Sequence, residues 1–180
     1  MSRYKRADEI GLNEEQTEAV AYHENEQGGH MTNMKYTLLR DLPSFRVYMG
    51  WYDLQKGLLK FLSEREFLIL SYSISTQNDC LVCGTFFRKI LIEKGEDLEN
   101  LQLSDREQVL WDLGRAFVVD FHHIPEDVYV RLDEIFSETE VIQILAFAGQ
   151  MAATNMFVTS AKVDLDEVLL NYRKKEKYNG

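Results

Sequence analysis

The chain is poor in the residues that interrupt or cross-link a fold. Its 180 residues include only two prolines and two cysteines. Few segments alternate between β-branched and polar residues, so we expect helices to dominate. The sequence shows no domain linker and no low-complexity tract. A chain of this length is typical of one domain with a substantial core.

Positive charge is also scarce. The chain has 20 Lys and Arg against 30 Asp and Glu, for a net charge of −10. This balance disfavours binding to nucleic acid and to anionic membranes, because both are polyanions. The basic N-terminus is followed by no apolar run, so we expect no signal peptide and a cytoplasmic protein. The uncharged stretch 141–161 is long enough to cross a bilayer, but its amide and hydroxyl side chains favour a helix buried in the protein or between subunits.

The two cysteines form one motif, Cys80-x-x-Cys83, which follows a polar turn. We expect Asn78 or Asp79 to be the N-cap of the helix that contains them. Positions three apart lie on one helix face, and a helix start favours a thiolate. In a reducing cytosol the pair indicates a working dithiol rather than a structural disulfide. The simpler interpretation is two small buried hydrophobic side chains.

Serine capping boxes mark three further helix starts, at Ser63, Ser104 and Ser137, each with glutamate three residues later. Pro43 is placed as a first-turn proline of a helix that reaches about Phe61. The patterns predict about eight helices in one all-α bundle. We divide the chain into an N-terminal extension with a short helix (1–31), the helical domain (32–172) and a charged tail (173–180).

The order and spacing of these motifs resemble the carboxymuconolactone decarboxylase and AhpD-like alkyl hydroperoxidase family. The resemblance is carried by the run Leu62–Leu70, a polar turn and then Cys80-x-x-Cys83, together with segments 33–43, 103–107, 136–142 and 163–166 and Asn155. It covers roughly residues 32 to 170. No single segment is specific, but their order is.

The resemblance implies an AhpD-like helical fold that self-associates, as a trimer or hexamer, and reduces hydroperoxides. Cys83 would attack the peroxide and become a sulfenic acid, and Cys80 would then resolve it to a disulfide. A cellular dithiol would reopen the disulfide. We expect no cofactor and no bound metal.

The sequence departs from the family at two positions. The histidine that peroxidase members carry four residues after the second cysteine is replaced by Phe87, which cannot transfer a proton. The family's relay glutamate would fall at Leu68, whereas Glu66 stands two residues earlier. A longer turn before the cysteines would let Glu66 approach them. The competing interpretation makes Glu66 only the capping-box partner of Ser63.

The sequence therefore predicts a thiol-dependent antioxidant enzyme, a peroxidase or disulfide oxidoreductase, with Cys83, Cys80 and Glu66 as catalytic residues. The alternative is a non-catalytic or differently acting helical oligomer that has lost the proton relay. His122 and His123 could replace the missing relay base, or complete a zinc site with the two cysteines. Thioredoxin-like chemistry is disfavoured, since its motif follows a strand. The family's decarboxylase branch does not depend on the cysteine pair, so the pair argues against it.

Overall fold

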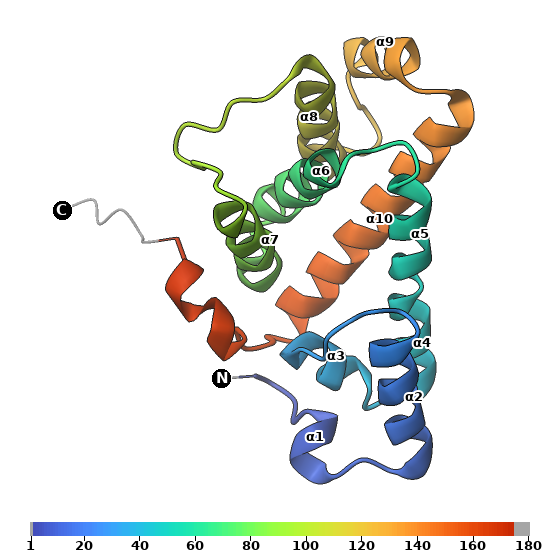
Figure 1. Cartoon of the computed structure of the whole chain (residues 1–180), viewed down its shortest axis with the longest axis vertical. Coiled ribbons are helices and arrows are strands. Elements are labelled where there is room, and N and C mark those ends of the chain that lie inside the picture. The colour runs from blue at the N-terminus through green and yellow to red at the C-terminus, as the bar shows by residue number, and fades with distance from the viewer. Residues whose placement is uncertain (1, 175–180) are drawn as a thin grey trace, which may run out of the picture.

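The structure, a computed structural model, describes residues 2–174, and in this range every regular element is a helix (Figure 1). The predicted all-α fold is confirmed. The helices are α1 (Ala7–Ile10), α2 (Glu14–Asn25), α3 (Asn33–Leu38), α4 (Leu42–Met49), α5 (Trp51–Leu58), α6 (Glu64–Gln77), α7 (Leu81–Glu93), α8 (Asp105–Val119), α9 (Glu126–Ile135), α10 (Glu138–Ser160) and the 3₁₀-helix η1 (Glu167–Tyr172).

The single helix expected from Pro43 to Phe61 is divided in two. Pro43 does lie in the first turn of α4, whose start is capped by Asp41. The helix ends at Gly50, which is at once the C-cap of α4 and the N-cap of α5. The Gly50 N–H donates to Val47 O at 3.3 Å, the tighter hydrogen-bond pattern of a 3₁₀ turn. The break contributes to a helix count above the predicted eight.

All three predicted capping boxes are present. The hydroxyls of Ser63, Ser104 and Ser137 accept the backbone N–H three residues on, and the glutamate there accepts the serine N–H. Each box satisfies two of the N–H groups that a helix start leaves free. Local sequence therefore fixes where α6, α8 and α10 begin.

The uncharged helix α10 runs through the molecule and packs on α5 and α6 (Figure 1). Its inner side buries Ile144, Phe147 and Ala148 completely, while Ile142 and Met156 are exposed. By length and composition alone α10 could cross a membrane, but 44% of its most apolar window is buried inside the protein. One such helix is weak evidence for a membrane span, and burial of this kind is typical of a core helix.

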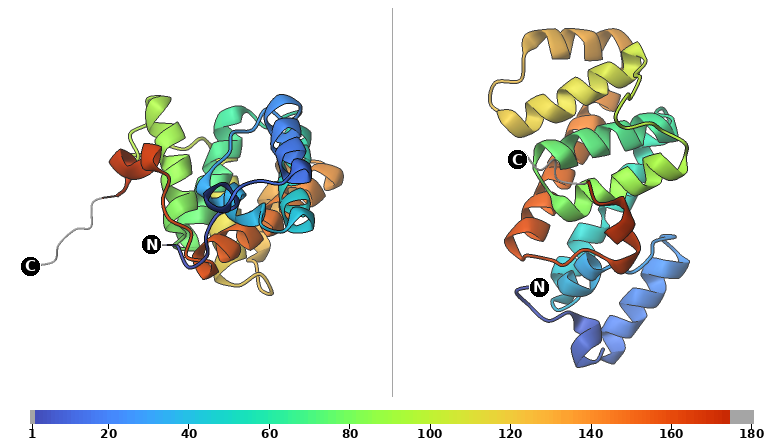
Figure 2. Two further views of the ribbon diagram at one scale, coloured as in Figure 1. Left: turned by 90° about the horizontal axis from the view of Figure 1, so that it is seen from below. Right: turned by 90° about the vertical axis from the view of Figure 1, so that its left-hand side faces the viewer.

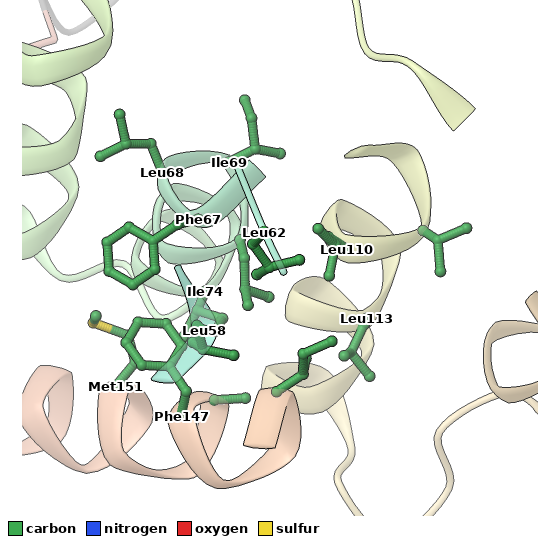
Figure 3. Close-up of a cluster of buried hydrophobic side chains, with 14 of the residues drawn as sticks. Leu58, Leu62, Phe67, Leu68, Ile69, Ile74, Leu110, Leu113, Phe147 and Met151 are labelled. Atoms are coloured by element: carbon green, nitrogen blue, oxygen red, sulfur yellow. The ribbon is translucent and has the colours of Figure 1, made fainter. Parts of the chain in front are cut away.

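Helices α7 and α8 pack on α6, and all three helices contact α10 (Figure 2). Figure 3 shows their shared core, in which Phe67 and Ile74 of α6 face Phe147 of α10 and Leu113 of α8. The closest approach is at Gly114, where a Cβ would overlap the hydroxyl of Ser73. This glycine lets α8 pack tightly on α6.

The N-terminal segment packs against the helical domain rather than standing apart from it. Ala7 of α1 is buried in a cluster with Leu38, Leu39, Phe45 and Met49 of α3 and α4 and the turn between them. The Ser2 N–H also donates to Asp164 at 2.6 Å. Of the predicted charged tail, residues 175–180 lie outside the described residues. The trimer or hexamer stays a prediction.

Candidate active site

The two cysteines lie at the start of α7, directly after the turn that leaves α6. Asn78 is the C-cap of α6, and Asp79 adopts a left-handed conformation with φ of 52°. Aspartate is among the residues that tolerate this region. The Cys80 N–H then donates to Ser75 O at 3.1 Å. This hydrogen bond closes a turn of two residues, after which α7 begins.

The N-cap of α7 is Cys80 itself. Our expectation of Asn78 or Asp79 was wrong, because both are used by the turn that ends α6. Cys80 has extended backbone angles, and its sulfur accepts the Cys83 N–H at 3.3 Å. A thiol thus stands where serine or aspartate usually caps a helix. Both sulfurs are free thiols.

The environment favours the thiolate on Cys80. A hydrogen bond from the Cys83 thiol, aided by backbone N–H groups and the Thr159 hydroxyl, lowers the pKa of Cys80 to about 7 despite its burial. The same hydrogen bond, together with burial, raises the pKa of Cys83. Thiolates are the nucleophilic form of cysteine. Of the two thiols, Cys80 therefore ionises first and Cys83 keeps its proton.

The two cysteines line different spaces. Cys80 lines an open pocket of about 680 Å³, together with Tyr72, Arg88, Trp111 and Arg115; we call it the outer pocket. Cys83 lines a separate cavity of about 500 Å³ with mostly apolar walls, which include Phe67, Phe147 and Met151; we call it the apolar cavity. Both volumes suit small organic ligands. Each buried cysteine thus borders a different space.

The positions of the missing relay residues lie at the apolar cavity. Leu68 and Phe87 both line it, beside Cys83, and both are buried. These are the positions at which the family resemblance places a glutamate and a histidine. Two apolar side chains make this side of Cys83 dry and leave it without a local base.

The structure does not bring Glu66 to the thiols. Glu66 lies in the first turn of α6, and Cys80 follows the last turn of that helix. At 1.5 Å per residue the two are roughly 20 Å apart along the helix. The turn between α6 and α7 has only two residues, Asn78 and Asp79, so it does not bring Cys80 back towards the start of α6. The Glu66 carboxylate instead accepts the Ser63 N–H at 2.7 Å and binds Arg106 Nε at 2.6 Å.

Glu66 belongs to a symmetric arrangement between the starts of α6 and α8. Arg106 of α8 binds Glu66 of α6, and Arg65 of α6 binds Glu107 of α8. We call these two ion pairs the crossed pairs. The pKa of Glu66 is lowered; burial would raise it, but hydrogen bonds from Arg106 and Ser63 outweigh that effect. The Glu66 carboxylate is thus engaged in packing two helix starts together.

His122 and His123 also lie away from the cysteines. They occupy the turn after α8, both are exposed, and His123 Nδ1 contacts Asp120 at 2.7 Å. Among residues 2–174 no group of three or more His, Cys, Asp or Glu side chains is arranged to hold a metal ion. The zinc alternative and the replacement base therefore find no support in the geometry.

The sequence alone did not identify Lys35, a buried residue that also lines the apolar cavity. Lys35 of α3 is 5% exposed and donates to His23, Tyr52 and the His30 carbonyl. We call His23, Lys35 and Tyr52 the lysine cluster. The one sequence signal was a lysine among the apolar positions of segment 33–43. Its partners come from α2 and α5, so no local pattern could reveal the cluster.

Comparison with known proteins agrees with the architecture. No family model matches the chain, and no curated protein matches its sequence. The structure defines a single-domain, all-helical protein of the AhpD-like fold class. It is similar to the crystal structure of the debrominase Bmp8 in its apo form, with a TM-score of 0.71 over 95% of this chain and 94% of that one. At 13% identity this likeness shows the fold alone.

Proposed function

We propose that Cys80 and Cys83 form a redox-active dithiol that reduces an organic hydroperoxide or a disulfide, with Cys80 as the first nucleophile. The observation that carries this proposal is the capping position of Cys80. Its sulfur receives the Cys83 N–H at 3.3 Å at the positive end of α7. A capping thiolate with a protonated thiol one turn away is the arrangement that dithiol chemistry requires.

With a hydroperoxide the reaction takes two steps. The Cys80 thiolate attacks the outer peroxide oxygen, an S–O bond forms as the O–O bond breaks, and the alkoxide leaves and takes the proton of Cys83. The Cys83 thiolate then attacks the sulfenic sulfur of Cys80, the S–S bond forms, and hydroxide leaves. The peroxide gains two electrons and the dithiol loses two. A cellular dithiol restores the pair.

This sequence of steps removes the need for a base beside Cys83. The alkoxide released in the first step can take the Cys83 proton, so the apolar residues Leu68 and Phe87 do not block the second step. The order is the reverse of the one implied by the family resemblance, in which Cys83 attacks first. The lowered pKa of Cys80 and the raised pKa of Cys83 support the reversal.

The two orders are separated by single serine variants. Cys83→Ser should still reduce one equivalent of cumene hydroperoxide and keep a sulfenic acid at Cys80, which dimedone traps for mass spectrometry. Cys80→Ser should react no faster than the double-serine variant. The rate of the first step should rise with pH through about 7, following the Cys80 thiolate. A dimedone adduct that forms only in Cys80→Ser would overturn the assignment in favour of Cys83.

A second candidate is a protein of the same fold without peroxidase activity. The observation that favours it is the pair Leu68 and Phe87, which puts two apolar residues at the relay positions of the cavity. The same assay decides: an intact protein that consumes peroxide no faster than its double-serine variant supports this candidate. A bromophenol belongs in the substrate panel, because the protein of similar structure is named as a debrominase.

A further inference from the structure

The ammonium group of Lys35 is buried at the wall of the apolar cavity with all of its donors in use. Nζ lies 2.9 Å from His23 Nε2, 2.6 Å from the His30 carbonyl oxygen and 2.7 Å from the Tyr52 hydroxyl. A protonated lysine has three N–H groups and no acceptor. Each of the three neighbours must therefore accept a hydrogen bond.

These three hydrogen bonds determine which nitrogen of His23 carries a proton and where the Tyr52 hydroxyl can donate. His23 Nδ1 lies 2.8 Å from Gln27 Oε1, so Nδ1 carries the proton and Nε2 is free to accept from Lys35. The Tyr52 oxygen accepts from Lys35, which leaves its own O–H to donate elsewhere. Within residues 2–174 no hydrogen bond donated by that O–H is present, and Tyr52, which is partly buried, lines the apolar cavity. The O–H is therefore open to an acceptor on a ligand in the cavity.

The positive charge of Lys35 also lacks a direct counter-ion. Within residues 2–174 no carboxylate lies within 4.0 Å of its Nζ, and Asp166 and Glu24 act on it only from farther away. The Asp166 carboxylate is held by the Asn33 N–H at 2.8 Å. Burial without a close carboxylate lowers the pKa of Lys35 to about 8. Buried cations in proteins are ordinarily paired.

The remainder of the cavity wall is mostly apolar and partly aromatic. Trp51 and Phe67 lie with their rings nearly parallel, at an interplanar angle of 9° and a centroid distance of 6.3 Å. Phe147 packs against Phe67 with centroids 5.0 Å apart, and Met151 completes this wall (Figure 3). Aromatic side chains favour stacked and edge-on contacts with other rings. The rings of Trp51 and Tyr52 are in contact, with centroids 4.4 Å apart. The cavity thus places an aromatic wall next to a hydroxyl donor and a cation.

We propose that the apolar cavity binds a small aromatic carboxylate, with the ring on the part of the wall that includes Trp51 and one carboxylate oxygen accepting the Tyr52 O–H. Lys35 stands directly behind that hydroxyl and supplies the compensating charge. The ligand would satisfy the free donor and the unpaired cation together. This site goes beyond the thiol chemistry and does not rest on it.

Three probes that differ only in the head group test the proposal by isothermal titration calorimetry: naphthylacetate, naphthylacetamide and naphthylethylamine. The carboxylate should bind best and the amine worst. Lys35→Met should weaken the carboxylate about tenfold or more, which is the effect of roughly 1.4 kcal/mol, and leave the amide within about twofold. Tyr52→Phe should weaken both the carboxylate and the amide, because both accept its O–H. Carboxylate binding should also decline as pH rises above about 8, where Lys35 loses its charge.

Lys56 provides the matched control. It lines the same cavity but is exposed, so Lys56→Met should leave carboxylate binding unchanged. Asp166 also lines the cavity, and Asp166→Asn should tighten the carboxylate severalfold by removing a like charge. The double-serine variant at 80 and 83 should bind as the unmodified chain does, which separates this test from that of the thiol proposal. Equal binding of all three probes, or a loss of carboxylate binding in Lys56→Met but not in Tyr52→Phe, would overturn the assignment.

Discussion

The crossed pairs and the lysine cluster both place charge inside the protein, but they compensate it differently. Glu66 and Glu107 are each buried, and each meets an arginine and the serine N–H of its own capping box. Lys35 is equally buried, yet its three partners are all neutral. The carboxylates have their charge neutralised within the fold. The lysine does not.

This difference separates structural charge from charge that is available to a ligand. A paired and hydrogen-bonded group resists change, because removing one partner leaves the other buried and uncompensated. An unpaired group costs free energy that binding of an opposite charge can recover. The same reasoning favours the structural interpretation of Glu66 and makes Lys35 and Tyr52 the groups available to a ligand.

The largest expected effect is the loss of a crossed pair. Glu66→Ala removes a capping-box carboxylate and an ion pair whose arginine is partly exposed, so we expect a loss of about 2–3 kcal/mol in the free energy of unfolding. Urea denaturation at pH 7 measures it. Glu64→Ala is the matched control, because Glu64 is the exposed neighbour whose partner Lys94 is also exposed, and should cost less than about 1 kcal/mol.

The same variant tests the two interpretations of Glu66. If the residue is structural, Glu66→Ala leaves the alkylation rate of Cys80 and its pH dependence unchanged. A protein that keeps its stability but loses peroxide turnover would instead support the catalytic role. The pKa of Glu66 is lowered in the folded state. The Glu66 carboxylate therefore stabilises the folded protein above the ordinary glutamate pKa of about 4.3, and this stabilisation is lost as the pH falls below that value.

The sequence was informative wherever a feature depends on neighbouring residues. The capping boxes of Ser63, Ser104 and Ser137 need only a serine and a glutamate three residues apart, and all three are confirmed. The helix start at the cysteines was also predicted, but its cap was misplaced by one or two positions. The error arose because the motif places the polar residues before Cys80, whereas the geometry of the turn uses them to end α6.

Features that join distant segments could not be predicted in this way. The crossed pairs connect residues about forty positions apart. Neither Ser-x-Arg-Glu segment contains a local pattern that predicts contact with the other. The lysine cluster joins α2, α3 and α5. The cavity beside Cys83 likewise depends on how α10 crosses α6, which periodicity does not determine.

The second prediction concerns the pH dependence that the lysine cluster gives to stability. The pKa of Lys35 is about 8 in the folded protein and 10.5 for an ordinary lysine. Between these values the folded state has released a proton that the unfolded chain still binds, so stability rises with pH. Relative to Lys35→Met, the unmodified chain should gain about 2 kcal/mol between pH 7 and pH 10. Denaturation midpoints at several pH values measure this difference, and Lys56→Met, at an exposed position, should show none of it.

The smallest effect is expected from the hydroxyl of Tyr52. Tyr52→Phe removes one acceptor from Lys35 and should cost about 1 kcal/mol at pH 7. The cost should shrink towards pH 10, because the hydrogen bond between the ammonium and the hydroxyl is charge-assisted, whereas the one between the neutral amine and the hydroxyl is not. Tyr48→Phe is the control, because no hydrogen bond of the Tyr48 hydroxyl is present within residues 2–174. The Tyr48 ring packs on Phe157. A Tyr52→Phe cost that stays constant from pH 7 to pH 10 would show that the hydroxyl serves packing and not the lysine charge, and the distinction between the two buried clusters would lose its electrostatic basis.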